Sequence, residues 1–537
     1  MADTGPRKVR FVRRVFAATP PAKATTTKLS IADASVARYS PCGAIWFFDG
    51  GPGADARTQG FFDRFEKALA HTLDEYSHFV GQVHWASKEL VAGDENPRHL
   101  GRPAVTYGST QDPGFELTIV DDDRELSTLV PSIEERNASQ RIWKASGLPQ
   151  NDFLPSTNLA LTSLTTYEGL PGAAAQLTAF KCGGFAVSVK LTHCLSDATC
   201  LLRFVHSWAR RSRQSSDDQQ KELAVSDIPV AVFDPTLLDG YAMLSTGPGE
   251  EAAERIRHAR SLPIHRFNWW ATDAPGYPSW ATASSKATMP PEEDMSKIEL
   301  SPSTHPPWPT WDMGAAVEHV QIHFKAAEVS AMKAAAMRTL PEDLKTLIVS
   351  RQDALLAHFW ILINRACQVE ELSEPVYMDM SLGMRNRLSP PLPDSYVGSP
   401  ILMAHIKKYV TNAATSTIGA VAGAIRQMMS QFTSQAVSDY LFEAAQEVSP
   451  QRLWQGFLGS RHVMVTSWAR ARAYEVDFCG TQDLARYVQS QMPLMDGLLQ
   501  LMDIADTGDF DVSLALEKDA MERLLGDPML KEYGNFE

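Results

Sequence analysis

The chain reads Phe185-Ala-Val-Ser-Val-Lys-Leu-Thr-His193-Cys-Leu-Ser-Asp197 at the point where a strand pattern gives way to a helix pattern. Apolar residues alternate with small or polar ones over residues 185–192, which predicts a strand with one buried face. His193 continues the apolar register, so its side chain is expected to point inward. Residues 198–208 then repeat apolar side chains at helical spacing. Asp197 stands where a helix N-cap belongs, and its carboxylate can accept the free N–H groups of the first turn.

This histidine has the chemistry of a general base. An imidazole with an ordinary pKa of about 6.5 can remove a proton from an alcohol or an amine near neutral pH. The H-x-x-x-D spacing between His193 and Asp197 is weak evidence by itself, because the chain holds 14 histidines, although no other histidine has an aspartate four residues on. A hydrogen-bonded core histidine beside an ordinary capping aspartate fits the same residues. This segment alone therefore leaves both interpretations open.

Four other segments carry short motifs in a fixed order along the chain. The first segment reads Leu29-Ser30-x-x-Asp33, and the second reads Ser350-x-x-Asp353-Ala-Leu. The third contains Met384-Arg385-Asn-Arg387 and, a few residues later, Tyr396-Val-Gly398-Ser399. The fourth contains Val465-Thr466-Ser467-Trp468-Ala-Arg470-Ala-Arg472 and then Asp477-Phe478-Cys479-Gly480-Thr481. Together with the His193 motif, they resemble the BAHD acyltransferases, the acyl-CoA-dependent enzymes of plant and fungal specialised metabolism. The long inserts and modified motifs are more similar to the fungal branch, which includes trichothecene O-acetyltransferases.

The resemblance implies an α/β (α+β) fold like that of chloramphenicol acetyltransferase, with two pseudo-symmetric domains and a channel between them. Residues 1–222 would form the N-terminal domain, 223–318 a crossover, and 319–537 the C-terminal domain, with part of about 478–505 packing on the N-terminal domain. The implied reaction moves an acyl group, expected to be acetyl, from acyl-CoA to a hydroxyl or amine of a small specialised metabolite. Acyl-CoA is then a co-substrate, and no bound cofactor or metal is expected.

The same resemblance assigns roles around the motif histidine. His193 would be the general base. Asp197 would point away from the site and hold the turn through a salt bridge. Asp477 would also be structural, bridging to an arginine of the Arg385-x-Arg387 segment, so Arg385 is expected near the site as a structural residue.

Five residues are candidates for binding CoA. By resemblance, Thr466 and Ser467 lie on the CoA channel, and Ser350 is a further candidate that also has the form of a helix N-cap. Arg470 and Arg472 alternate with alanines, so strand spacing would place both on one face, next to the Thr-Ser pair. That face is either a site for the CoA phosphates or a solvated strand surface, and the spacing leaves both open.

The chain departs from the family pattern at several positions. Only Asp477 and Phe478 remain of a D-F-G-W-G signature, and Ser399 stands where the family has asparagine after glycine. Some relatives of these enzymes are non-catalytic partners of other biosynthetic enzymes, and the altered signature leaves room for that alternative. The retained His193 and Thr466-Ser467 pair favour catalysis.

Composition limits the remaining classes of function. The 537 residues carry a net charge of −14, which argues against nucleic acid and anionic membranes as partners. No apolar run approaches the roughly 20 residues that span a bilayer, and the first residues lack the apolar core of a secretory signal. The six cysteines are scattered without metal-binding spacing. We therefore expect a cytoplasmic protein. We also expect a monomer, although composition does not bear on the oligomeric state.

The predicted crossover is rich in proline and glycine but also in large aromatic residues. Five of the 12 tryptophans lie there, namely Trp269, Trp270, Trp280, Trp308 and Trp311. A disordered linker would not normally carry so many aromatic rings. The crossover is therefore expected to be ordered, with the rings either fixing it in place or forming a wall of an acceptor pocket.

Overall fold

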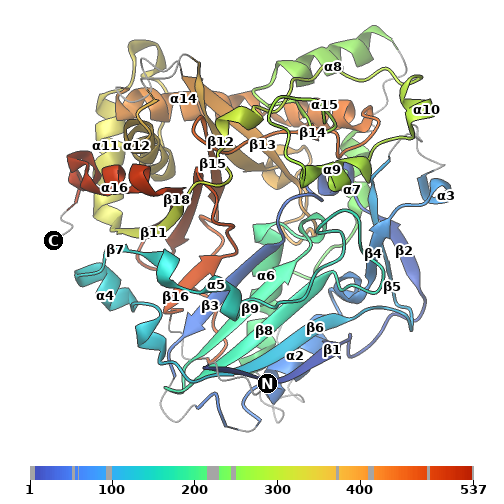
Figure 1. The fold of residues 1–537 in the computed structure, drawn as a ribbon, viewed down its shortest axis with the longest axis vertical. Helices are drawn as coiled ribbons and strands as arrows, with labels where there is room; N and C mark the ends of the chain where they lie inside the picture. The colour runs from blue at the N-terminus through green and yellow to red at the C-terminus, as the bar shows by residue number, and fades with distance from the viewer. Residues whose placement is uncertain are drawn as a thin grey trace.

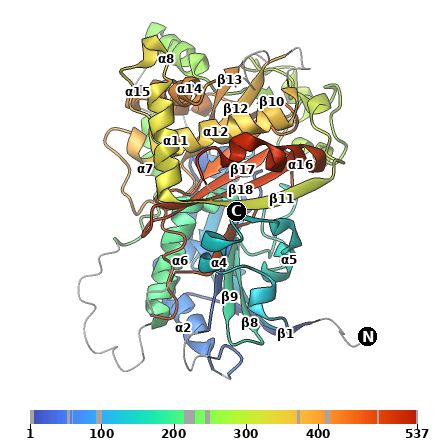
Figure 2. The same ribbon diagram turned by 90° about the vertical axis from the view of Figure 1, so that its left-hand side faces the viewer.

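The protein folds into two α/β halves, shown one above the other in Figures 1 and 2. The computed structural model describes residues 6–50, 55–58, 60–91, 100–213, 229–242, 249–369, 374–408, 416–480 and 484–534. The predicted boundary between residues 222 and 223 lies outside these residues. Each half is built around one large twisted sheet with its own hydrophobic core.

The N-terminal half has a six-stranded sheet that carries the His193 segment. In spatial order its strands are β1 (Arg7–Val15), β6 (Phe115–Asp122), β8 (Ala173–Phe180), β9 (Phe185–Leu191), β3 (Cys42–Phe48) and β16 (Tyr487–Ser490). Helices α2 (Asp63–Thr72) and α6 (Ala198–Arg213) pack together on one face, and α5 (Gln150–Phe153) lies on the other side of the sheet (Figure 2). Helix α4 (Ile133–Ala138) lies near the β16 edge, where Arg136 donates to the backbone oxygen of Arg486. The strand and helix predicted around His193 are thus confirmed as β9 and α6.

The C-terminal half has a seven-stranded sheet covered by long helices. In spatial order its strands are β13 (Ile401–Lys408), β12 (Val376–Gly383), β15 (His462–Ser467), β17 (Leu498–Ile504), β18 (Asp509–Glu517), β11 (Val317–Phe324) and β7 (Ile142–Trp143). The helices in contact with α12 (Arg351–Ala366) are α11 (Ala326–Arg338), α14 (Ile418–Gln431) and α16 (Lys518–Gly526). Apolar side chains of α12 and of the strands fill the core between them.

The two halves exchange one strand each. Strand β16 comes from the C-terminal part of the chain, yet it pairs with β3 in the N-terminal sheet. Strand β7 comes from the N-terminal part, yet it pairs with β11 in the C-terminal sheet. Of the span 478–505, only β16 lies in the N-terminal sheet, whereas β17 belongs to the C-terminal sheet. No single cut of the chain would therefore separate the two halves with both large sheets complete.

The crossover packs on the C-terminal half and has a small core of its own. It contains α7 (Pro235–Ala242), α8 (Glu250–Ser261), β10 (Phe267–Asn268), α9 (Ala281–Lys286) and α10 (Glu292–Met295), and it contacts β14 (Leu453–Trp454) and α15 (Ser434–Ala445). Four of its five tryptophans are buried in one cluster, whereas Trp280 is 59% exposed. The buried rings therefore fix the crossover to the C-terminal half.

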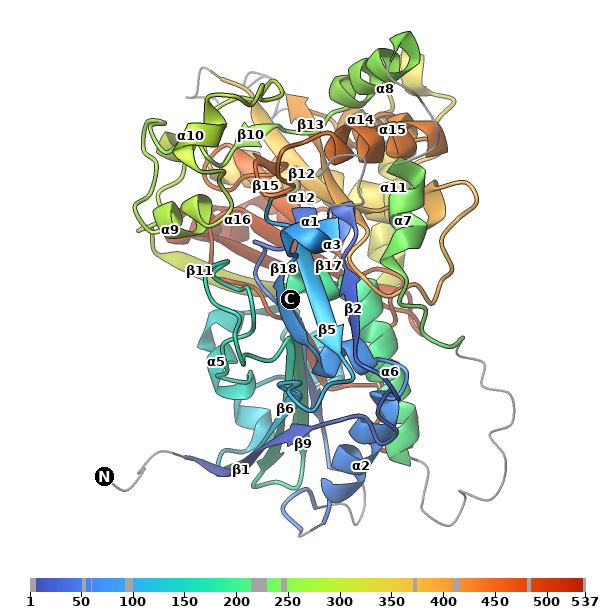
Figure 3. The same cartoon turned by 90° about the vertical axis from the view of Figure 1, so that its right-hand side faces the viewer.

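A third, smaller sheet lies where the two halves meet. Its strands are β2 (Thr25–Lys28), β5 (Pro103–Tyr107) and β4 (Gln82–Trp85), and α3 (Lys88–Val91) follows β4. Helix α1 (Ile31–Ser35) lies beside this sheet, near α7 (Figure 3), and contacts both α7 and α15. In the part of the chain that the structure describes, no helix is both long and apolar enough to cross a membrane.

Candidate active site

His193 lies in a short turn directly after β9 and is held by a serine from the other half of the protein. Its ring nitrogen Nδ1 lies 3.2 Å from the Oγ of Ser399. The hydroxyl of Ser399 donates its own hydrogen to the backbone oxygen of His193, at 2.6 Å. Because that hydrogen is already used, the contact with the ring requires that Nδ1 carry the proton. Nε2 is then the nitrogen with the free lone pair.

The surroundings keep the His193 imidazole neutral. Burial lowers the pKa of His193 below its ordinary value, because desolvation disfavours the charged form. The ring of Tyr39 lies edge-on to the imidazole, with 5.4 Å between ring centroids, and supplies part of that burial. A neutral imidazole with a free Nε2 is the form that a general base requires.

Asp33 fixes the position of Ser399, the residue that contacts His193. Its Oδ1 accepts the backbone N–H of Ser399 at 2.5 Å, and its Oδ2 accepts the N–H and O–H of Ser30 at 3.1 and 2.6 Å. Burial raises the pKa of Asp33 to about 6 despite these hydrogen bonds. Gly398 has φ +145° and lies so close to Asp33 that a Cβ atom would come within 2.8 Å of Oδ1. The Leu29–Asp33 motif and the Tyr396–Ser399 motif therefore meet at His193.

Ser399 should affect the rate of the reaction through the orientation of His193. Replacement of Ser399 by alanine removes two hydrogen bonds, one to the imidazole and one to the backbone oxygen of His193, each with a net contribution of about 0.5–1.5 kcal/mol. Loss of the contact with the ring is expected to lower kcat by about 2- to 10-fold. Loss of the contact with the backbone oxygen should lower the melting temperature only slightly, because the contact of Ser399 with Asp33 is made by the backbone and remains. Steady-state kinetics of Ser399→Ala, with the exposed Ser163→Ala as control, test this. An unchanged kcat would show that Ser399 does not position the ring.

Asp197 has a structural position and is turned towards Arg385. The two side chains form a buried ion pair with contacts of 2.5 and 3.1 Å. Oδ1 of Asp197 also accepts the N–H of Cys200 at 2.9 Å, which makes Asp197 the N-cap of α6 as predicted. Arg385 further donates to the backbone oxygens of Tyr396 and Gly398. The pair therefore ties the His193 turn to the loop that carries Ser399.

The predicted partner of Asp477 is wrong. Asp477 lies 3.4 Å from Arg213 of α6, not beside the Arg385–Arg387 segment. Arg385 is occupied by Asp197, and Arg387 donates to the backbone oxygens at the end of α14. Oδ1 of Asp477 accepts the N–H groups of Cys479 and Gly480 at 2.9 and 2.7 Å, so it fixes a local turn. Thr481, the last residue of this altered signature, lies outside the described residues.

Three of the predicted CoA-binding residues lie near the N-terminus of α12. Thr466 and Ser467 end strand β15, and Nε2 of Gln352 donates to Oγ of Ser467 at 2.8 Å. Ser350 is the N-cap of α12, where its Oγ accepts the N–H of Asp353 at 3.1 Å. Gln352 was not predicted, because nothing in its local pattern distinguishes it from any other residue of the first helical turn.

The predicted strand face of Arg470 and Arg472 is also wrong. Strand β15 ends at Ser467, and both arginines have left-handed backbone conformations, with φ of 67° and 56°. The N–H of Arg470 donates to Asp503 at 2.9 Å, and the guanidinium of Arg472 lies 3.7 Å from Asp506. The chain turns here because it leaves the C-terminal sheet to supply β16 to the other sheet. Both side chains are nevertheless exposed beside the Thr-Ser pair.

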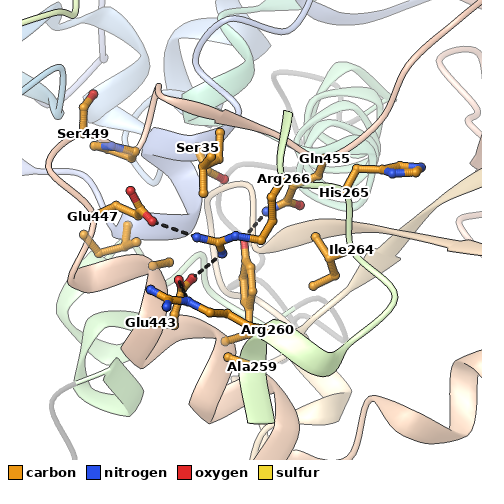
Figure 4. A pocket seen from close by; sticks show the side chains of 15 residues that line it. Ser35, Ala259, Arg260, Ile264, His265, Arg266, Glu443, Glu447, Ser449 and Gln455 are labelled. Carbon is orange, nitrogen blue, oxygen red and sulfur yellow. Dashed lines mark hydrogen bonds and ion pairs between the residues drawn. The ribbon is translucent and has the colours of Figure 1, made fainter. Parts of the chain in front are cut away.

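A separate cavity of about 40 Å³ lies between α1, α15 and the crossover (Figure 4). Its lining includes none of the residues predicted for catalysis or CoA binding. Arg266 extends across it to Glu443 and Glu447, with contacts of 2.9 and 3.0 Å, and Arg260 lies 3.0 Å from Glu443. These charges neutralise one another across the cavity.

Comparison with known proteins identifies the family. The sequence model of the Transferase family matches residues 150–231 and 274–529, more than half of the chain. The chain belongs to this family, the BAHD acyltransferases. It is 23% identical over 508 residues to the acyltransferase AFT15-1 of the fungus Alternaria alternata, a match that covers 91% of this chain and 90% of that protein. The predicted family and its fungal branch are thereby confirmed, and the protein is an acyltransferase.

Solved structures confirm the predicted fold. The crystal structure of F. graminearum TRI101 with coenzyme A and T-2 mycotoxin covers 95% of this chain and 99% of its own, with a TM-score of 0.66 and 16% identity. The structure of vinorine synthase covers 97% of this chain and 98% of its own, with a TM-score of 0.61 and 14% identity.

Proposed function

We propose that this protein transfers an acyl group, with acetyl as the expected group, from acyl-CoA to a hydroxyl or amine of a small specialised metabolite. The observation that carries the proposal is the position of His193, whose Nδ1 lies 3.2 Å from Oγ of Ser399 in a buried site that lowers the pKa of the imidazole. This arrangement leaves Nε2 free to accept a proton. The TRI101 crystal structure, a complex with coenzyme A and T-2 mycotoxin, supports the same two classes of substrate.

The chemistry follows from the position of that proton. Nε2 of His193 accepts the proton of the acceptor as its oxygen or nitrogen attacks the thioester carbonyl. The tetrahedral intermediate collapses, the carbon–sulfur bond breaks, and the CoA thiolate takes the proton back from Nε2. Such a base contributes about 10²–10⁴ in rate, and holding both substrates in place contributes more. The reaction would take place between the two halves, in a cytoplasmic monomer.

Arg470 and Arg472 are proposed to attract the CoA phosphates beside Thr466 and Ser467. Both guanidinium groups are exposed, so each contact is expected to contribute about 0.2–1 kcal/mol. The double variant Arg470→Ala/Arg472→Ala should therefore raise the KM for acyl-CoA by about 2- to 30-fold and leave kcat unchanged. Steady-state kinetics with varied acyl-CoA test this, with Arg64→Ala as a control on the surface of α2. An unchanged KM would contradict the phosphate role.

Two linked measurements test the proposed function. Thermal denaturation with and without CoA reports binding, and mass spectrometry of metabolites incubated with enzyme and acetyl-CoA reports transfer. An acylated product formed by the wild type supports the proposal. Binding of CoA without a product would indicate another acyl donor or a missing acceptor. Neither binding nor a product would favour the alternative of a non-catalytic partner protein, which the altered Asp477–Thr481 signature suggested.

A further inference from the structure

A second group of histidines surrounds a buried aspartate in the C-terminal half. Asp379 lies on β12, directly opposite His405 on the neighbouring strand β13. His462 lies on β15, on the other side of β12. His265 belongs to the crossover, and its ring stacks on that of His405 with 4.0 Å between centroids. Three adjacent strands and the crossover therefore bring these side chains together, and none of them belongs to the His193 site.

Three of these side chains converge on one point. Nε2 of His265 lies 3.1 Å from Oδ1 of Asp379, and Nδ1 of His462 lies 2.9 Å from Oδ2. One ligand atom from each of the three residues lies within 4.8 Å of the other two. A tetrahedral ion with bonds of about 2.0–2.1 Å needs ligand atoms about 3.3 Å apart. The two nitrogen–oxygen separations of 3.1 and 2.9 Å are already close to that value.

Asp379 differs in its charged partners from Asp511, the aspartate of the other buried aspartate–histidine pair in the C-terminal sheet. Asp511 has His323 at 2.7 Å, but it also has the permanent positive charge of Arg136 at 2.5 Å. Within the described residues, the ion pairs of Asp379 are with His265 and His462 alone. Its side chain is 0% exposed. Oδ2 of Asp379 also accepts the backbone N–H of Phe457 at 2.9 Å, but a backbone N–H carries no net charge, and a bound cation would balance the buried carboxylate.

We propose that His265, Asp379 and His462 bind one divalent transition-metal ion of the zinc type. Two imidazoles and one carboxylate are ligands that Zn²⁺ prefers. A water molecule would complete the coordination as the fourth ligand. The ion is structural in this proposal: it links the crossover, through His265, to two strands of the C-terminal sheet. It plays no part in acyl transfer.

Zinc binding by the full-length, tag-free protein tests this inference. The protein is dialysed against EDTA, freed of chelator and titrated with Zn²⁺, and bound metal is counted by mass spectrometry. The inference predicts about one ion per chain and a higher melting temperature with Zn²⁺ than with Mg²⁺. Asp379→Asn and His265→Gln should each bind Zn²⁺ at least about tenfold more weakly. The control His258→Gln removes an exposed histidine that pairs with Asp439 at 2.8 Å without a third ligand, and it should bind as the wild type does.

Three results would overturn the inference. They are absence of stoichiometric zinc in the wild type, equal zinc binding by Asp379→Asn, and equal loss in His258→Gln. If the ligand variants fail to fold, the absorption spectrum of the Co²⁺-loaded wild type decides. Tetrahedral Co²⁺ with nitrogen and oxygen ligands supports the site, and the spectrum of hydrated Co²⁺ contradicts it. None of these measurements depends on acyl transfer. Failure of the zinc inference would therefore leave the proposed function unaffected, and failure of the proposed function would leave the zinc inference unaffected.

Discussion

Replacement of His193 by alanine is expected to lower kcat by about 10²–10⁴-fold, because alanine has no imidazole nitrogen that could take the proton from the hydroxyl or amine of the acceptor substrate. The fold should persist, since the hydrogen bond that His193 accepts from Ser399 is made by its backbone oxygen. Kinetics with a defined acceptor and a melting curve check both parts. A variant that keeps more than about a tenth of the wild-type kcat would rule out His193 as the general base.

The pH profile separates loss of the base from general damage. Burial lowers the pKa of His193, so the neutral imidazole is present above that pKa and is lost as the pH falls through it. The wild-type kcat should therefore be level at neutral pH and decrease only at pH values below about 6.5. The residual activity of His193→Ala should lack this decrease. An acid decrease that persists in the variant would assign it to another group.

Replacement of Asp197 by alanine is expected to reduce the free energy of unfolding by about 3–5 kcal/mol, because it leaves the buried Arg385 guanidinium without its carboxylate. The variant also loses the N-cap hydrogen bond of α6. Chemical denaturation measures the effect. Replacement of Arg213, the part-exposed partner of Asp477, by alanine is the control and should cost about 0–1 kcal/mol.

A double variant shows whether the pair itself causes the loss. Asp197→Asn combined with Arg385→Met leaves no unpaired buried charge, so its cost should be smaller than the sum of the two single costs. Purely additive costs would contradict a direct interaction between the two side chains. A stable but inactive Asp197→Ala protein would instead indicate a direct role in the reaction.

Local patterns were sufficient for much of the fold and for the centre of the site. The alternation before His193 predicted β9, apolar periodicity predicted α6, and the N-cap form of Ser350 indicated the start of α12. These features depend on residues that are neighbours in sequence, so periodicity and cap chemistry reveal them. The family resemblance added the two-domain arrangement and the salt bridge of Asp197, whose partner proved to be Arg385.

The features that were missed depend on contacts between distant segments. The alternation of Ala and Arg around Arg470 resembles a strand, but the chain must turn there to deliver β16 to the other sheet. Asp477 pairs with Arg213 and Asp197 pairs with Arg385, and sequence spacing does not reveal which arginine each aspartate reaches. His265, Asp379 and His462 lie in three distant segments that share no sequence motif. Their proximity is therefore apparent only in the folded structure.

Transfer of a labelled acetyl group tests the central claim most directly. Wild-type protein and His193→Ala are incubated in parallel with acetyl-CoA that carries ¹³C in its acetyl group and with an extract of small metabolites, and products are identified by mass spectrometry. The account predicts a labelled ester or amide that forms with the wild type and is reduced by about 10²-fold or more with the variant. Equal labelling by both proteins would contradict the role of His193, and CoA binding without labelling of any metabolite would contradict acetyl transfer.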